Sequence, residues 1–425
     1  MGLETTYPMA IGQISVFRDM EKLAPERLWE ANLPFQWDLS QEASIEEVWA
    51  AFGEVSMRHE SMRTNYRVEE SGELLQFLAA DDPATIMSMV DHGAIELAEI
   101  PNFKDFEERK TQQVIDIYHG IPWRAWVVTE DGVPKKVVFI VHHIVADGAA
   151  LLVIRDDFNA LLAGEELPPP AGQPRIMALN ERGAGAGRLR TAERYWRRTL
   201  GASPRVAPDA PPSHEMIGAT MYTGIPLELA HEGAAKLNAS IQSVVLAAMY
   251  STLREITGRQ QILLFPMTAN RFDSNTATVV TSLNQWVPLL LEFDGSESFA
   301  DLASKVHWKA FNSLKNGFCD PDFIVDIREE FEQADPPVDA GFNYNGIFAP
   351  PGMFVPVEPE PPKTDFYVPT RATGPDFYLI ARSLQRIDLI VRTTRAEFDQ
   401  PTLATFMTTM NAILLKVAGL PASTG

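Results

Sequence analysis

The stretch VHHIVADGAA (residues 141–150) indicates both a fold and a site. The residues that lead to the histidines, KKVVFIV (135–141), form an apolar, β-branched run without helical spacing, which predicts a buried strand that ends at the two histidines. The residues after it, LLVIRDDFNALLAG, return to the spacing of a helix. His142, His143, Asp147 and Gly148 therefore lie at a predicted strand-to-helix junction, where side chains and free backbone amides can face a ligand.

These residue types suit proton transfer. A histidine takes up and returns a proton near neutral pH, and it works best on a rigid element such as a strand end. Asp147 has two possible roles: it contacts an imidazole, or it turns away and anchors the loop through an arginine. Gly148 lets the backbone approach a ligand closely, and the amides that open the next helix can face a developing oxyanion. The set predicts acyl transfer by a general base without a covalent intermediate, because no serine or cysteine lies in a nucleophile elbow such as G-x-S-x-G.

Two alternatives stay open for the histidine pair. The pair can be a satisfied, partly buried structural feature, and Asp-Gly is a common turn signal. A metal site is the third interpretation, but neighbouring histidines on a strand point to opposite faces and cannot easily share one ion.

The composition of the whole chain narrows its class. At 425 residues the chain exceeds what one core usually covers, which predicts two lobes with a boundary near residue 175, at 1–175 and 176–425. A net charge of −21 argues against nucleic acid or an anionic membrane as a partner. The single cysteine, Cys319, allows no internal disulfide and no zinc-binding cluster. No signal peptide or membrane-spanning run is evident, so we expect a soluble, cytoplasmic protein.

The remaining pattern is mixed α/β. Residues 43–60 predict an amphipathic helix with a capping box of Ser44 and Glu47, and residues 240–258 predict a second helix that ends at Gly258. Other segments read as strands or loops: a strand at 261–267, proline-rich loops at 164–175, 202–215 and 349–363, strands at 376–384 and 386–394, and a closing helix from about 401.

Several segments, in order, resemble the condensation domains of nonribosomal peptide synthetases and related carrier-protein-dependent acyltransferases. Residues 142–148 match the HHxxxDG signature of that family, and RHESMRTNY (58–66) looks like its RHExLRTxF segment. Five further segments also resemble condensation-domain sequences: YHGIPWRAWV, AERYWRRTL, TGRQQILLFPMTANR, TSLNQWVPL and FDQPTLATF. The resemblance implies two chloramphenicol-acetyltransferase-like lobes in a V-shaped pseudo-dimer, with a central tunnel between them.

The resemblance also implies roles for particular residues. His143 would face the tunnel as the catalytic residue, while His142 supports the strand. Asp147 would be structural and pair with an arginine across the lobes, with Arg271 the first candidate and Arg63 the second.

Two aromatic residues, Trp286 and Tyr344, would line the acceptor side of the tunnel, with core packing as the alternative. Some family features are missing. The usual serine two residues beyond the glycine is replaced by Ala150, and the glycine before LN is absent, with Ser282 nearby. KNGFCDPDF and GFNYNG occupy the places of the usual HQDxPF and RDxSRNP segments.

The function implied is that of a free-standing, monomeric condensation enzyme. A carrier-bound acyl or aminoacyl group would arrive as a thioester on a phosphopantetheine arm and be joined to a small-molecule or carrier-bound amine or hydroxyl, giving an amide or ester. No cofactor or metal would be bound by the enzyme itself. The alternatives are a coenzyme A-dependent O-acyltransferase, an epimerase, and a catalytically silent module that recruits carrier proteins or tailoring enzymes.

Overall fold

The computed structural model describes residues 5–205, 215–339, 341–349, 356–371, 374–383 and 385–421. The chain divides into two compact units. Unit 1 comprises Met1–Leu189 and Ala269–Gln285, and unit 2 comprises Arg190–Thr268 and Trp286–Gly425. The segment Ala269–Gln285 belongs to unit 1 although it lies far along the chain, and a single division at residue 175 does not include it. The two lobes at 1–175 and 176–425 stay a prediction.

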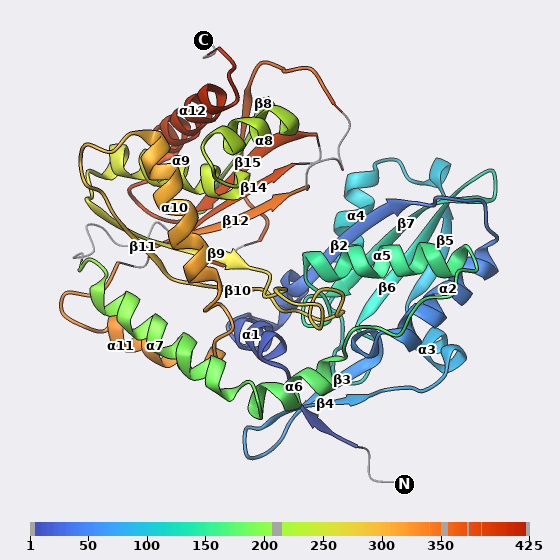
Figure 1. Ribbon diagram of the computed structural model, residues 1–425. Coiled ribbons are helices and arrows are strands. Elements are labelled where there is room, and N and C mark those ends of the chain that lie inside the picture. The colour runs from blue at the N-terminus through green and yellow to red at the C-terminus, as the bar shows by residue number, and fades with distance from the viewer. Residues whose placement is uncertain are drawn as a thin grey trace. The chain divides into compact units, whose positions relative to one another are not determined.

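A four-stranded sheet in unit 1 carries the strand that leads into the histidine pair (Figure 1). Its order is β2 (Asn32–Asp38), β7 (Val133–His142), β6 (Trp123–Glu130) and β5 (His92–Glu96). Neighbouring strands are antiparallel except β5 and β6, which are parallel. Because β7 is flanked on both sides and covered on both faces, Val137–Val141 are fully buried, which explains its continuous apolar run.

Two helices cover one face of this sheet. α2 (Ile45–Arg58) and α5 (Gly148–Leu162) pack against each other. The ring of Phe52 on α2 lies 4.7 Å from that of Phe158 on α5 and 5.8 Å from that of Phe139 on β7, measured between centroids. This aromatic cluster fixes α5 on the sheet, and with it the junction where α5 begins.

A third helix, α4 (Phe103–Thr111), lies against the opposite face. Trp126 pairs in register with Val138, the residue before Phe139, so its side chain points away from the α2–α5 face. There it meets Phe106 of α4 edge-on, with ring centroids 6.3 Å apart. The core of unit 1 is therefore a helix–sheet–helix sandwich.

A small antiparallel sheet completes unit 1, in the order β1 (Tyr7–Pro8), β4 (Leu74–Leu78) and β3 (Thr64–Val68). The other helices of this unit are α1 (Ile11–Met20), α3 (Pro83–Met89), α6 (Pro174–Arg182) and the 3-10 turns Pro25–Ala31, Glu60–Arg63 and Leu97–Glu99.

Unit 2 is built on an eight-stranded sheet. Its order is β10 (Gln285–Trp286), β9 (Gln261–Thr268), β12 (Phe342–Phe348), β14 (Phe377–Ser383), β15 (Arg386–Thr393), β8 (Ile217–Pro226) and β13 (Lys363–Tyr367), and β11 (Leu289–Glu292) also pairs with β9. β12 runs parallel to both β9 and β14.

In unit 2, α9 (Ile241–Thr257) packs against α8 (Leu227–Lys236), α10 (Phe299–Leu314) and α12 (Gln400–Val417) (Figure 1). α9 ends where Gly258 adopts a left-handed conformation with φ of 68°, as a helix C-terminus favours. The other helices are α11 (Pro321–Glu332) and α7 (Ala186–Ala202), whose first turn belongs to unit 1.

The local predictions from sequence agree well with this structure. The mixed α/β class is confirmed, as are the capping box of Ser44 and Glu47 on α2, the strand β7, the helix end at Gly258 and the two late strands β14 and β15. The loops predicted at 202–215 and 349–363 lie partly outside the described residues. Across those residues, none of the helices combines the length and hydrophobicity needed to span a lipid bilayer.

Candidate active site

The histidine pair lies where β7 turns into α5, as predicted. β7 ends at His142, and α5 begins at Gly148 with Asp147 as its N-cap. The backbone of the turn is firmly held: the amide of His143 donates to the carbonyl of Ala31 at 2.7 Å, and that of His142 to the carbonyl of Pro122 at 3.0 Å. A turn fixed in this way holds the backbone of both histidines rigidly.

His142 is a buried, structural residue. Its side chain is enclosed, and Nδ1 accepts a hydrogen bond from the amide of Ile144 at 3.1 Å. Burial lowers the pKa of His142 from its ordinary value of 6.5 to about 3, and the neighbouring His143 adds to the lowering. The imidazole is therefore neutral at physiological pH and braces the turn from inside.

His143 has the environment of a general base. Its side chain keeps some exposure, yet the atoms packed around the imidazole still lower its pKa below the ordinary 6.5. Hydrogen bonding to the backbone at His143 and Ala146 and the charge of Asp147 act in the opposite direction without cancelling the effect of burial. A neutral imidazole at neutral pH can accept a proton directly.

Asp147 turns away from both imidazoles. Its Oδ1 accepts from the amide of Ala150 at 2.9 Å and from a guanidinium nitrogen of Arg271 at 2.8 Å, and its Oδ2 accepts from the amide of Leu283 at 3.0 Å. Among the described residues, no hydrogen bond joins this carboxylate to His143. The arrangement is an anchor for the turn and not a triad-like relay.

The partner of Asp147 belongs to the same compact unit. Arg271 lies in the segment 269–285, which clusters with unit 1 although the chain on either side of it belongs to unit 2. The pairing itself agrees with the sequence-based prediction. The family resemblance also implied that this pair joins two lobes, but Asp147 and Arg271 both belong to unit 1.

The segment 269–285 is held in place at several points. Besides Asp147, Arg271 donates to the carbonyls of Thr276, Val279 and Thr281. A Cβ atom on Gly12 of α1 would lie 2.0 Å from the carbonyl oxygen of Ser282, so only glycine permits this close approach.

The packing of segment 269–285 places Ser282 close to His143. The hydroxyl of Ser282, which is fully buried, lies 3.4 Å from Nδ1 of His143, and it donates to Oδ1 of Asn284 at 2.9 Å. Sequence reasoning noted Ser282 only as a departure from the family pattern and missed Asn284. The single signal available was the position of Ser282 near the glycine that is missing from the family pattern.

Gly148 opens the helix next to free space. A Cβ atom added there would meet no other atom within 4 Å, and its backbone is not left-handed. The prediction that a ligand approaches this backbone is compatible with that space and stays a prediction.

Three further candidate residues lie apart from this cluster. Arg63 is buried in unit 1 and donates to the carbonyl of Ala80, so Arg271 and not Arg63 is the partner of Asp147. Trp286 of unit 2 packs edge-on against Tyr378, with ring centroids 5.3 Å apart. Tyr344 lies in the buried core of unit 2. The assignment of the two aromatic residues to the acceptor side stays a prediction.

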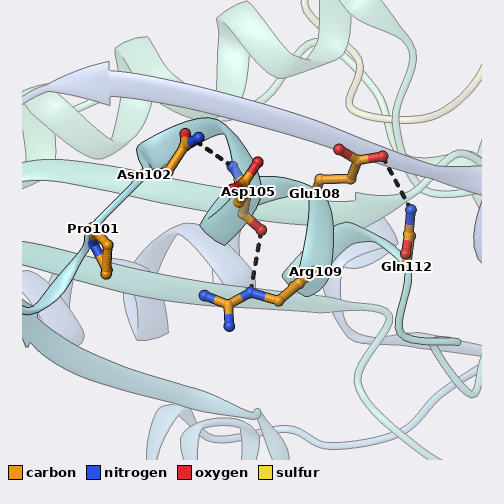
Figure 2. Close-up of a pocket in the computed structure, with 6 residues that line it drawn as sticks. All are labelled: Pro101, Asn102, Asp105, Glu108, Arg109 and Gln112. Carbon is orange, nitrogen blue, oxygen red and sulfur yellow. Dashed lines mark hydrogen bonds between the residues drawn. The ribbon is translucent and has the colours of Figure 1, made fainter.

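A separate cavity of about 490 Å³ runs along α4 (Figure 2). Its polar side chains bond to each other or to the helix backbone: Asn102 caps α4, Arg109 donates to the carbonyl of Asp105, and Gln112 donates to Glu108. None of the residues predicted for the site lines it. In the part of the chain that the structure describes, no three His, Cys, Asp or Glu side chains gather as a metal site requires.

Comparison with known proteins identifies the family. The condensation-domain model matches residues 21–424, which is nearly the whole chain. A plipastatin synthase of Bacillus subtilis is 23% identical over 338 residues, covering 77% of this chain, and a hybrid PKS-NRPS synthetase of Acremonium sp. is 21% identical over 341 residues, covering 76%. The chain spans only 9% and 8% of the length of these two relatives.

A solved structure shares the fold. The condensation domain that mediates chain release from the enacyloxin polyketide synthase superimposes with a TM-score of 0.77 at 19% identity, covering 100% of this chain and 84% of that one. The predicted mixed α/β fold of condensation domains is therefore confirmed. With the family model matched from residue 21 to residue 424, this chain belongs to the condensation-domain family, whose members serve natural-product synthetases.

Proposed function

We propose that this protein joins a carrier-bound acyl or aminoacyl thioester to an amine or hydroxyl, forming an amide or an ester. The observation that carries the proposal is the contrast between the environments of His143 and Asp147 at the β7–α5 turn. His143 is a neutral base on a rigid strand end, while Asp147 is fully engaged with Arg271 and backbone amides. Such a site is built for proton transfer at one imidazole.

The proposed reaction needs one proton carrier. His143 removes the proton from the attacking amine or hydroxyl as its nitrogen or oxygen bonds to the thioester carbonyl carbon. When the tetrahedral intermediate collapses, the carbon–sulfur bond breaks and the protonated imidazole returns the proton to the leaving thiolate. The first amides of a helix have no acceptors within that helix. The Ala150 amide already donates to Asp147, so the amides of Gly148 and Ala149 are the ones that can stabilise the oxyanion.

The free energy of the reaction comes with the donor. A thioester is already activated, so catalysis consists of positioning two substrates and moving one proton. The phosphopantetheine arm belongs to the carrier substrate and is not a resident cofactor. The enacyloxin relative, in which a condensation domain mediates chain release, supports a donor of this kind.

A product assay tests the proposal. The protein is incubated with carrier proteins loaded with octanoyl or aminoacyl groups, with the matching coenzyme A and N-acetylcysteamine thioesters, and with a panel of amines and alcohols. Mass spectrometry is expected to detect an amide or ester with carrier-bound donors. Product from coenzyme A thioesters alone would favour the O-acyltransferase, and exchange of the aminoacyl α-proton with D₂O would favour the epimerase. Carrier binding without either product would favour the recruitment module.

A further inference from the structure

A buried serine far from the histidines in sequence is hydrogen-bonded to the turn between β7 and α5. Ser61 lies in the 3-10 turn Glu60–Arg63, and its hydroxyl donates to the carbonyl oxygen of Val145 at 2.9 Å. Val145 belongs to the turn itself, two residues after His143 and two before Asp147. Because Ser61 and Val145 are both fully buried, a carbonyl that lost this donor would be costly to leave unpaired.

The hydrogen bond acts on the part of the turn that contacts the imidazole. The carbonyl of Val145 and the amide of Ala146 form one planar peptide group. The backbone of Ala146 hydrogen-bonds to the imidazole of His143. On its other side, Val145 donates its amide to the carbonyl of His142 at 2.9 Å. The bond from Ser61 therefore fixes the peptide group that leads into Ala146, and with it the contact between Ala146 and His143.

The 3-10 turn that carries Ser61 is itself firmly held. The carbonyl of Met62 accepts from the indole nitrogen of Trp123 at 3.0 Å, and the guanidinium of Arg63 donates to the carbonyl of Ala80 at 2.7 Å. Both contacts involve residues that directly follow Ser61. Its hydroxyl therefore reaches the catalytic turn from a rigid backbone.

A buried phenol directs the hydroxyl. Ser61 also hydrogen-bonds to Tyr66, whose phenol oxygen accepts from Nε2 of Gln13 on α1 at 3.2 Å. A serine has one proton to donate, and that proton is directed to Val145, so Ser61 accepts from the O–H of Tyr66. The hydrogen bonds all run in one direction, from α1 to the catalytic turn, and bonds in such a chain strengthen each other.

We propose that Ser61 is a positioning residue for the reaction, whose hydroxyl holds the Val145–Ala146 peptide group against the imidazole of His143. The family resemblance gives it no role: in RHExLRTxF the position of Ser61 is unspecified, and that of Tyr66 is phenylalanine. The proposal rests on the proposed function of His143, but the state of the turn can be measured without any substrate.

The first test is NMR of full-length protein labelled with ¹³C-carbonyl valine and ¹⁵N-alanine, which detects only Val-Ala steps. The chain has three such steps, at 145–146, 206–207 and 417–418, and Ala207→Ser and Ala418→Ser identify the other two signals. In Ser61→Ala the carbonyl signal of Val145 should move upfield, because the carbonyl loses its donor. Ser61→Cys, whose thiol is a weaker donor of similar size, should give an intermediate shift.

The second test is the pKa of His143, measured by pH titration of ring signals that are lost in His143→Asn. The hydrogen bond to the backbone of Ala146 raises this pKa, so a loosened turn should lower it in Ser61→Ala. With an active donor and acceptor, kcat should fall by about 3- to 10-fold, the value of one hydrogen bond. The acidic limb of the pH profile should move to lower pH, and KM should change little because Ser61 is fully buried.

The matched control is Ser56→Ala. It removes another fully buried hydroxyl of unit 1, on α2, which has no hydrogen-bond partner among the described residues. The carbonyl signal of Val145, the pKa of His143 and kcat should all stay as in the wild type.

An unchanged carbonyl signal of Val145 in Ser61→Ala would overturn the proposal, and so would an unchanged pKa of His143. Neither measurement depends on activity. If both move as expected but no product forms with any substrate, the proposed function fails while the placement of the turn by Ser61 stands.

Discussion

The carboxylate of Asp147 and the guanidinium of Arg271 form a buried ion pair at 2.8 Å, with 3% and 7% of the side chains exposed. The pair joins the N-terminus of α5 to a segment that lies 124 residues further along the chain. It thereby fixes the loop that carries Ser282 against the turn that carries His143. Among the described residues, no hydrogen bond joins the pair to the imidazole of His143.

Breaking this pair should destabilise the protein strongly. Asp147→Ala and Arg271→Ala each leave a buried charge without its partner, which costs about 3–5 kcal/mol. The double variant should lose much less than the sum of the two, because it leaves no uncompensated charge. Denaturant unfolding of the four proteins gives the coupling free energy.

The matched control is the exposed pair of Arg197 and Glu330, which lies at 2.9 Å with 54% and 55% of the side chains exposed. Its coupling free energy should be below about 1 kcal/mol. Additive losses at Asp147 and Arg271 would show that the pair does not act as a unit.

His142 should make the protein sensitive to acid. Its pKa is about 3 in the folded state and near 6.5 when unfolded, so the unfolded state binds a proton that the folded state does not. This contribution to stability is full above pH 6.5 and is lost as the pH falls towards 3, by roughly 2 kcal/mol between pH 6.5 and 5. His142→Asn, whose amide oxygen can replace Nδ1 as the acceptor, should flatten the pH dependence of unfolding. Identical slopes in both proteins would contradict the prediction.

The pH profile of catalysis should reflect the lowered pKa of His143. The base works when neutral, so activity appears as the pH rises through that pKa. Since burial holds it below 6.5, the acidic limb of kcat/KM should have its midpoint below pH 6.5. A limb centred well above 6.5 would indicate a different base or a protonated resting state.

Much of this local structure could be predicted from sequence, because its causes are local. The apolar run of β7, the capping box of α2 and the glycine that ends α9 act over a few residues. The strand-to-helix turn with His142 and His143 followed from the same patterns.

Contacts between distant residues could not be derived in this way. The approach of Ser282 to His143 spans 139 residues, and the bond from the Leu283 amide to Asp147 spans 136. Both depend on the packing of segment 269–285 into unit 1, which no local pattern encodes. The pairing of Asp147 with Arg271 was anticipated only through the family resemblance.

The reaction should need neither ATP nor a metal ion. The chain has no Walker loop, dinucleotide fingerprint or metal-binding cluster in its sequence, and a thioester supplies the driving force. We expect full activity in EDTA without ATP, and no acyl group on the protein by intact-mass measurement. Activity abolished by EDTA and restored by a metal would make the histidines ligands. A stable acyl-enzyme would require a nucleophile, and Cys319, a buried thiol whose pKa is raised by burial, would be the first residue to examine.

The most direct test of the central claim is the turnover of His143→Ala with a carrier-bound thioester and an accepted amine or alcohol. His119→Ala is the matched control, since His119 is an exposed histidine of the same unit with 85% of its side chain accessible. Loss of a general base should lower kcat by about 10²- to 10⁴-fold while the protein stays folded, and His119→Ala should behave as wild type. A folded His143→Ala variant with near-wild-type turnover would contradict the account, because His143 would then not be the base.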